Sequence, residues 1–223
     1  MKKFAWIAAV LAALLLSYAG YARYQHDQFV KAIVPHVKSV SVRVANSARY
    51  EMSDDSAITY RELFEKLEAD IEEIDQQLVT VQTMTTADHR NSIEPVVDYL
   101  ESSQEFLRAL LSKYRKQLAF SSATDWMISQ LEDLNSATYY SYDFERKSYL
   151  EAVADANKAS DEYKASIPEL GQATARLKRS IERVGKIVPR DALLDTSMVE
   201  TILRTNPAPV DSSALTGASE SQS

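Results

Sequence analysis

The sequence predicts an all-α fold: an antiparallel helical bundle with coiled-coil-like heptad seams, preceded by an N-terminal apolar helix. The 223-residue chain has only 4 Gly, whereas folds with many tight turns need Gly where φ is positive. It has no Cys, which excludes disulfides and thiolate metal sites. Long segments repeat apolar residues at alternating spacings of three and four, as helices that pack side by side do.

The charge balance bears on the class of partner. The chain carries 25 Lys and Arg against 32 Asp and Glu, a formal net charge of −7. An anionic surface repels the phosphates of nucleic acids, so no nucleic-acid partner is predicted. A hydrophobic content of 45% is sufficient for a packed core.

The N-terminal segment is the most apolar part of the chain. Lys2 and Lys3 precede residues 4–22, which carry no charge. An uncleaved membrane anchor needs about 20 apolar residues. A cleaved signal peptide needs a shorter apolar run and small residues at the cleavage site, which residues 17–19 and 20–22 both offer. A buried helix of a cytosolic protein is the third and least favoured interpretation.

The first two interpretations give the same topology, because basic residues stay on the cytoplasmic side. We therefore expect a bacterial inner-membrane protein with a single pass and its C-terminal domain in the periplasm or outside. The alternative is a periplasmic or secreted protein after signal cleavage. The predicted organisation is a signal anchor or signal peptide (1–22), an exported helical bundle (23–204) and a disordered tail (205–223).

The bundle begins with a helix over residues 23–50. One face of this helix would carry Phe29, Ile33, Val37, Val40 and Val44. A local strand at residues 40–44 stays open, because valines also alternate there. Pro35 should bend this helix or mark its restart.

Residues 51–59 form a turn, and Thr59 and Glu62 have the spacing of a capping box, so the next helix should begin near Tyr60. Its heptad seam, the row of apolar residues at spacings of three and four, is the strongest structural signal. This seam consists of Phe64, Leu67, Ile71, Ile74, Leu78 and Val81.

A second turn is expected at residues 83–91, and Pro95 should lie in the first turn of the helix that follows. Residues 121–124 form a polar break after this helix. Its seam has one polar member and consists of Ile93, Val97, Leu100, Gln104, Leu107, Leu111, Tyr114 and Leu118.

A long helix is then predicted from Trp126 to about Ser166, with a bend at residues 136–142. Pro168 should open another helix, which Pro189 ends. Asp195 and Thr196 should cap a short helix that reaches about Arg204. The seam of the Pro168 helix consists of Leu170, Thr174, Leu177, Ile181, Val184 and Val188.

Motifs for catalysis or metal binding are largely missing. The sequence contains no P-loop, no dinucleotide-binding Gly pattern and no serine-nucleophile motif. His26, His36 and His89 have neither Glu-x-x-His nor His-Glu-x-x-His spacing, so each is interpreted as an ordinary side chain. Asp54, Asp55 and the carboxylates of residues 65–75 are interpreted as solvated. We predict no cofactor, no metal and no enzymatic activity.

Two features are candidate partner-binding sites. The first is an aromatic cluster, which on a helix would place Tyr139, Tyr142 and Tyr149 on one side and Tyr140 and Phe144 on the other. The second is a basic stripe directed away from its helix's seam. It consists of Arg176, Arg179, Arg183, Lys186 and Arg190. Core packing for the aromatics and solvation for the stripe are the competing interpretations.

A third charge pattern runs beside the seam of the second helix: Glu65, Glu68, Glu72 and Asp75. These carboxylates should flank a neighbouring helix and choose its register.

These features predict a non-enzymatic interaction or scaffold module of the bacterial cell envelope that presents helix faces to a protein partner. The seams must pair with each other or with another chain, so a homo-oligomer stays open. The alternative is a ligand-binding sensory bundle. It would have to signal through another protein, because no second apolar stretch crosses the membrane. A secreted effector or an enzyme is a less favoured class.

Overall fold

The computed structural model describes residues 2–47, 59–84 and 90–199, with side chains described from residue 14 in the first range and residue 93 in the last. Within these ranges every regular element is a helix, which confirms the all-α class. The elements are α1 (Lys2–Ser47), α2 (Tyr60–Thr83), α3 (Arg90–Asn135), α4 (Tyr142–Val184) and the 3₁₀ helix η2 (Arg190–Ala192).

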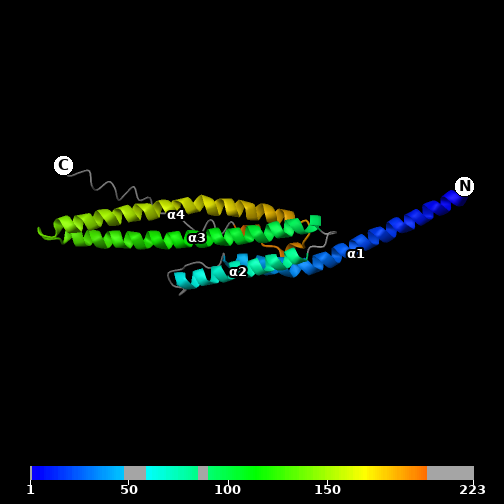
Figure 1. The fold of residues 1–223 in the computed structure, drawn as a ribbon, viewed down its shortest axis with the longest axis horizontal. Coiled ribbons are helices and arrows are strands. Elements are labelled where there is room, and N and C mark those ends of the chain that lie inside the picture. Colours follow the sequence, from blue (N-terminus) through cyan, green and yellow to red (C-terminus); the bar gives the residue numbers. More distant parts are fainter. Residues whose placement is uncertain (1, 48–58, 85–89, 200–223) are drawn as a thin grey trace.

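Successive long helices alternate in direction and lie along one axis (Figure 1). The second half of α1, all of α2, the first half of α3 and the second half of α4 form a four-helix body. The first half of α1 extends beyond this body at one end. The far halves of α3 and α4 extend beyond it at the other end as a two-helix hairpin.

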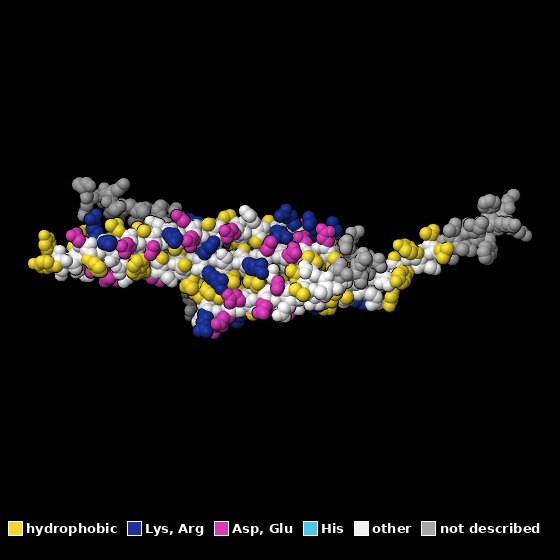
Figure 2. Space-filling view, viewed as in Figure 1, with side chains coloured by type: hydrophobic (Ala, Val, Ile, Leu, Met, Phe, Trp, Pro, Cys, Tyr) yellow, Lys and Arg dark blue, Asp and Glu magenta, His cyan; other side chains and the backbone are white. Residues whose placement is uncertain are grey.

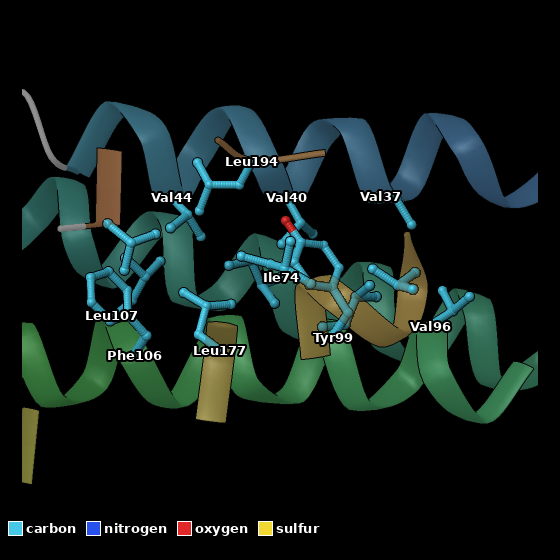
Figure 3. Packing of buried hydrophobic residues seen from close by; sticks show 14 of the residues in the cluster. Val37, Val40, Val44, Ile74, Val96, Tyr99, Phe106, Leu107, Leu177 and Leu194 are labelled. Carbon is cyan, nitrogen blue, oxygen red and sulfur yellow. The ribbon is translucent and has the colours of Figure 1, made fainter. Parts of the chain in front are cut away.

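The core lies inside the four-helix body (Figure 3). The predicted face of α1 is buried throughout, from Phe29 to Val44. The alternative strand at residues 40–44 is wrong, since these residues are helical and Val42 is 50% exposed between two buried valines. Helix α1 continues through Pro35.

Helix α2 begins where its capping box predicts. The Thr59 hydroxyl accepts a hydrogen bond from the Glu62 amide at 3.3 Å, and the Glu62 carboxylate accepts one from the Thr59 amide at 3.1 Å. Its seam alternates in burial. Leu67, Ile74 and Val81 are fully buried, and Phe64, Ile71 and Leu78 are half-buried against the core.

Helix α3 differs from its prediction in three respects. Pro95 lies inside the helix rather than in its first turn. The predicted break at residues 121–124 is wrong, because α3 continues to Asn135. The Thr124 hydroxyl donates to the Phe120 carbonyl at 2.8 Å, so this polar residue is satisfied by its own helix. Helix α3 also has a second buried row, which consists of Val96, Tyr99, Phe106 and Leu110.

Helix α4 differs as well. The helix predicted from Trp126 is interrupted at residues 136–141 and begins again at Tyr142, so the predicted bend is a chain reversal. Pro168 lies inside α4 and does not open a new helix. A proline inside a helix costs about 3 kcal/mol, and burial of the row from Leu170 to Val184 outweighs this cost. All six predicted seam residues from Leu170 to Val188 are buried.

The chain after α4 folds back onto the body. Val188, Ala192 and Leu194 are buried, and the Ala192 carbonyl accepts a hydrogen bond from the Ser41 hydroxyl of α1 at 2.9 Å. Residues 196–199 are helical, and the Asp195 carboxylate accepts a bond from the Ser197 amide at 2.9 Å. The short helix therefore starts as predicted. Its end and the predicted disordered tail lie outside the described residues.

The predicted anchor lies largely outside the described side chains, which omit residues 2–13. Among the residues that were searched, no helix has both the length and the apolar character needed to span a membrane. The helix backbone does continue through this segment as part of α1. Where the side chains are described, Leu14, Leu15 and Leu16 are 62%, 69% and 74% exposed.

Candidate partner-binding site

The projecting hairpin, which we call the stalk, comprises residues 121–135 of α3 and 142–162 of α4. It begins where the Phe120 ring stacks parallel to the Tyr163 ring, with centroids 6.2 Å apart. Along one face of α3, Phe106 and Leu110 are followed at helical spacing only by polar residues: Lys113, Gln117, Ser121 and Thr124. Apolar side chains continue along the stalk part of α3, but Trp126, Ile128 and Leu131 are 41%, 48% and 40% exposed, so no other described helix covers them.

Small residues hold the two helices of the stalk together. On α4, Ala152, Ala156 and Ser160 are buried, and among the described helices α3 alone runs beside this part of α4 (Figure 1). Small side chains let two helix backbones approach closely. The stalk is thus a thin, two-helix projection.

A hydrogen-bonded turn closes the stalk. The Ser136 and Ala137 amides donate to the Glu132 and Leu134 carbonyls at 3.1 and 3.2 Å, which ends α3. The Thr138 carbonyl accepts from the Ser141 and Tyr142 amides, both at 3.0 Å. The Ser141 hydroxyl accepts in turn from the Thr138 amide at 3.1 Å. These bonds order a turn that contains no glycine.

The aromatic cluster lies at this turn, which we call the tip. Tyr139 and Tyr140 are 93% and 97% exposed, and their rings meet edge to face with centroids 5.7 Å apart. Tyr142 and Phe144 follow in the first turn of α4 and are also exposed, whereas Tyr149 is half-buried farther down the stalk. Figure 2 shows hydrophobic side chains at this end of the molecule.

The predicted grouping of the cluster is therefore wrong. It assumed one continuous helix, but Tyr139 and Tyr140 belong to the chain reversal. The alternative of core packing is also wrong for these two residues. The signal available in the sequence was the run of Asn135, Ser136, Thr138 and Ser141, since such residues favour turns.

The tip encloses a shallow hollow of about 450 Å³. Aromatic and polar side chains line it together: Ala137, Thr138, Tyr139, Tyr140, Tyr142 and Asp143. Asp143 was not among the predicted site residues. Phe144, although exposed and adjacent in sequence, does not line this hollow.

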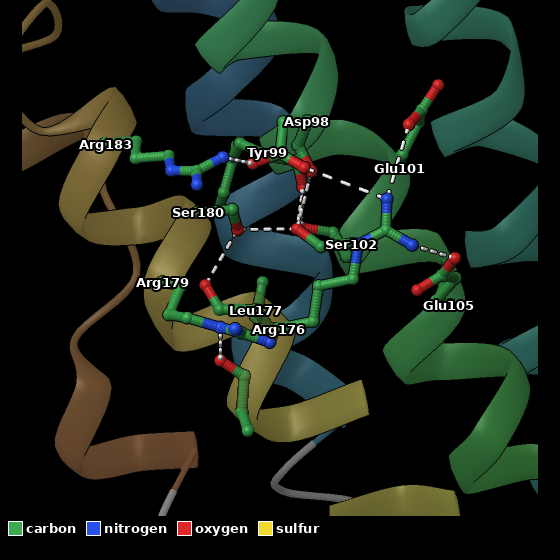
Figure 4. A network of polar contacts seen from close by, with 12 residues as sticks. Asp98, Tyr99, Glu101, Ser102, Glu105, Arg176, Leu177, Arg179, Ser180 and Arg183 are labelled. Atoms are coloured by element: carbon green, nitrogen blue, oxygen red, sulfur yellow. Dashed lines mark hydrogen bonds and ion pairs between the residues drawn. The ribbon is translucent and has the colours of Figure 1, made fainter. Parts of the chain in front are cut away.

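The basic stripe of α4 is divided between internal ion pairs and solvent. Arg176 lies among three carboxylates of α3 (Figure 4): Asp98 and Glu101 are 3.8 and 3.6 Å away, and Glu105 forms a close ion pair. Arg183 pairs with Asp98 at 3.2 Å. The prediction that the stripe points away from the bundle is wrong for Arg176, which is half-buried against the acidic edge of α3. Arg183 contacts the same edge, but its side chain is 66% exposed.

The rest of the stripe lies on the surface. Arg179 is exposed and its Nε donates to the Ala175 carbonyl of its own helix at 3.3 Å. Lys186 and Arg190 are also exposed. Only these three dispersed cations remain available to an anionic partner, and salt screens their attraction for it.

Two of the four carboxylates in the acidic row of α2, Glu68 and Asp75, contact α3 as predicted. Glu68 forms an ion pair with Arg115, and the Asp75 carboxylate accepts a hydrogen bond from the Gln104 amide at 3.1 Å. Glu65 instead pairs with Arg61 of its own helix. These contacts fix the alignment of α2 with α3.

A second hollow of about 390 Å³ lies on the body. Arg108, Leu111, Ser112, Arg115 and Lys116 line it. Arg115 is paired with Glu68 and lies over the Phe64 ring, and Lys116 is 3.7 Å from Glu169. Two of its three cations are thus already in internal ion pairs.

Two buried groups have shifted pKa values. Burial raises the pKa of Tyr99 to about 12, although hydrogen bonds from Ser41 and Ser103 oppose the shift. The Tyr99 hydroxyl lies 2.8 Å from the Ser41 hydroxyl. Burial lowers the pKa of Lys113 to about 8. Neither group lies near the tip, so we assign both to the core.

The described residues contain no group of three or more His, Cys, Asp or Glu side chains that could hold a metal ion. His36 contacts the Gln77 side chain, and His26 is exposed. His89, Asp54 and Asp55 lie outside the described residues.

Comparison with known proteins gave no match to a family model, to a curated protein or to a solved structure.

Proposed function

We propose that this chain is a non-enzymatic interaction module of the bacterial cell envelope, in which the stalk presents the tip to a protein partner. The observation that carries the proposal is the full exposure of Tyr139 and Tyr140 at the end of a two-helix projection. Exposed aromatic residues are enriched where proteins bind one another. Core packing does not require them at this position.

The other end of the molecule supports the membrane part of the proposal. The exposed residues Leu14, Leu15 and Leu16 belong to the uncharged segment 4–22, and exposed tyrosines follow these leucines at positions 18, 21 and 24. Such tyrosines suit the interfacial belt of a bilayer. The proposal therefore includes segment 4–22 as an apolar anchor helix in the inner membrane. It also includes coiled-coil packing of the heptad seams.

If segment 4–22 anchors the chain as proposed, the tip lies far from the anchoring membrane. Helix α3 has 46 residues, a length of about 70 Å at 1.5 Å per residue, and the anchor leaves the body at the opposite end (Figure 1). The tip therefore acts at a distance from its own membrane. This separation favours the role of a spacer that carries a binding site.

The test is site-specific photo-cross-linking in intact cells of the source bacterium. A photoreactive residue at position 140 should give one discrete protein adduct. The same probe at position 154, exposed on the stalk, and at position 172, exposed on the body, should give little. Equal adducts at all three positions, or none at 140, would contradict the proposal.

The anchor is tested separately by sequencing the N-terminus of the mature protein and by extracting membranes at high pH. We expect residues 1–22 to be retained and the protein to stay in the membrane pellet. A mature chain that starts at residue 20 or 23 would establish the alternative, a cleaved signal peptide.

A further inference from the structure

We propose that the tip captures a positively charged side chain, an arginine or a lysine, from its protein partner. This inference rests on the proposed function and specifies the chemistry of the partner. It comes from the hollow at the tip, which combines three tyrosines with one carboxylate.

The aromatic walls suit a cation. The faces of aromatic rings carry negative electrostatic potential, and they attract ammonium and guanidinium groups within about 6 Å of the ring centroid. The Tyr139 and Tyr140 rings are inclined at 82° to each other. Tyr142 lies on the same hollow, so a cation seated there could approach more than one ring.

The carboxylate of Asp143 adds a full charge of the matching sign. It lines the hollow, and within the described chain it forms no ion pair. The residues that flank the tip in sequence are acidic in balance, since Glu132, Asp133 and Glu145 outnumber Arg146 and Lys147. Of these two cations, Lys147 is already 3.9 Å from Glu151.

The same charges argue against other occupants. Phenol rings can lie at a bilayer surface, but an excess of carboxylates is repelled by a leaflet of anionic lipids. A purely apolar side chain in the hollow would remove water from Asp143 without giving its carboxylate a partner, which is costly. A basic side chain on a protein surface satisfies both the rings and the carboxylate.

The experiment titrates full-length protein in a maltoside detergent, which carries no cation, and follows the tyrosine signals by NMR. The probe is a peptide of alternating arginine and alanine. The matched probe replaces each arginine by citrulline, which keeps the shape and removes the charge. We expect saturable shifts at Tyr139 and Tyr140 with the arginine peptide and at least a tenfold weaker Kd with the citrulline peptide.

Three variants localise the effect. Tyr140→Leu keeps apolar surface but removes a ring face, and it should weaken the Kd about two- to fivefold. Asp143→Asn should weaken it by a similar factor and reduce its salt dependence. Phe144→Leu is the matched control, because Phe144 is 69% exposed but lies off the hollow, and it should leave the Kd unchanged.

Three results would overturn the inference. These are equal affinity for the citrulline peptide, full affinity in Tyr140→Leu, and binding of tetramethylammonium or phosphatidylcholine vesicles in preference to the arginine peptide. In any of these cases a discrete adduct at position 140 would still support the proposed function. Peptide binding without an adduct in cells would instead contradict the proposed protein partner.

Discussion

Lys113 is the residue at which burial and charge conflict most clearly. Its side chain lies in the body at 4% exposure, and within the described chain it forms no ion pair. Desolvation disfavours its charged form, so its pKa falls to about 8 in the folded protein. The spacing of apolar residues does not predict that Lys113 is buried, because a lysine beside Tyr114 is equally compatible with the solvent face of a helix.

This burial predicts an unusual dependence of stability on pH. Between pH 8 and the ordinary lysine pKa near 10.5, the unfolded chain binds the proton and the folded chain does not, so stability should rise with pH. From pH 10 upward, burial of neutral Tyr99, whose pKa is raised from 10.0 to about 12, acts in the opposite direction. Urea unfolding measured from pH 7 to 10 should show the rise.

The variant Lys113→Met should remove this rise and stabilise the protein at pH 7 by about 2 kcal/mol. Lys116→Met is the control, because Lys116 reaches solvent, with its side chain 29% exposed, and it should keep the wild-type pH profile. A stability of Lys113→Met at or below that of wild type at pH 7 would show that the lysine is solvated.

At the scale of the element, the heptad seam of α2 shows that equal periodicity does not mean equal burial. Ile74 is fully buried in the core, whereas Ile71, one turn earlier in the same seam, is half-buried. The cause is that α2 has partners on one side only, so one row of its seam faces inward and the other lies along the edge.

Truncation of these two isoleucines should therefore have unequal effects. Ile74→Ala should destabilise the protein by about 2–5 kcal/mol, because it leaves a cavity in a packed core. Ile71→Ala should cost about 1 kcal/mol, since solvent and edge side chains can fill the space. Thermal unfolding followed by circular dichroism measures both, and equal losses would contradict the observed packing.

The stalk is stabilised by small residues at a helix contact and not by a core. We therefore expect it to open locally while the body stays folded. Ala156→Leu should push α4 away from α3 and increase local opening of the stalk, because a larger side chain does not fit a close helix contact. Ala154→Leu, at an exposed position on the same helix, is the control.

Hydrogen exchange measures this local opening. In Ala156→Leu, protection should fall for amides of the stalk and remain unchanged for amides of the body, such as those around Leu177. Uniform loss of protection would mean that stalk and body unfold together.

At the scale of the whole molecule, the shape is a rod rather than a sphere (Figure 1). A compact 223-residue protein would have a radius of gyration of about 17 Å. Helix α3 and the projecting half of α1, each helix having 46 residues, instead lie end to end over about 105 Å, which gives a radius of gyration of about 30 Å.

Small-angle neutron scattering on the full chain, in detergent matched to the solvent, should give this larger value. A radius of gyration near 17 Å would mean that the projecting half of α1 or the stalk folds back on the body. The proposed role as a spacer would then lose its basis.

Short-range sequence patterns were sufficient to predict the elements that depend on local chemistry. The capping box at Thr59 placed the start of α2, and the spacing of Phe29, Ile33 and Val37 identified the buried face of α1. Scarcity of Gly was enough to exclude turn-rich folds. These features depend on residues a few positions apart, where helical geometry alone decides which side chains share a face.

How far each helix extends, and which of its faces are covered, depends on packing between helices that are distant in sequence. Residues 121–124 and Pro168 carry signals for a helix end, yet both lie inside long helices, since contacts between α3 and α4 outweigh a weak local preference. The same pairing turns the predicted bend at residues 136–142 into the tip and so exposes Tyr139 and Tyr140. A side chain's exposure depends on which distant segment lies against it, and this information is absent from local spacing.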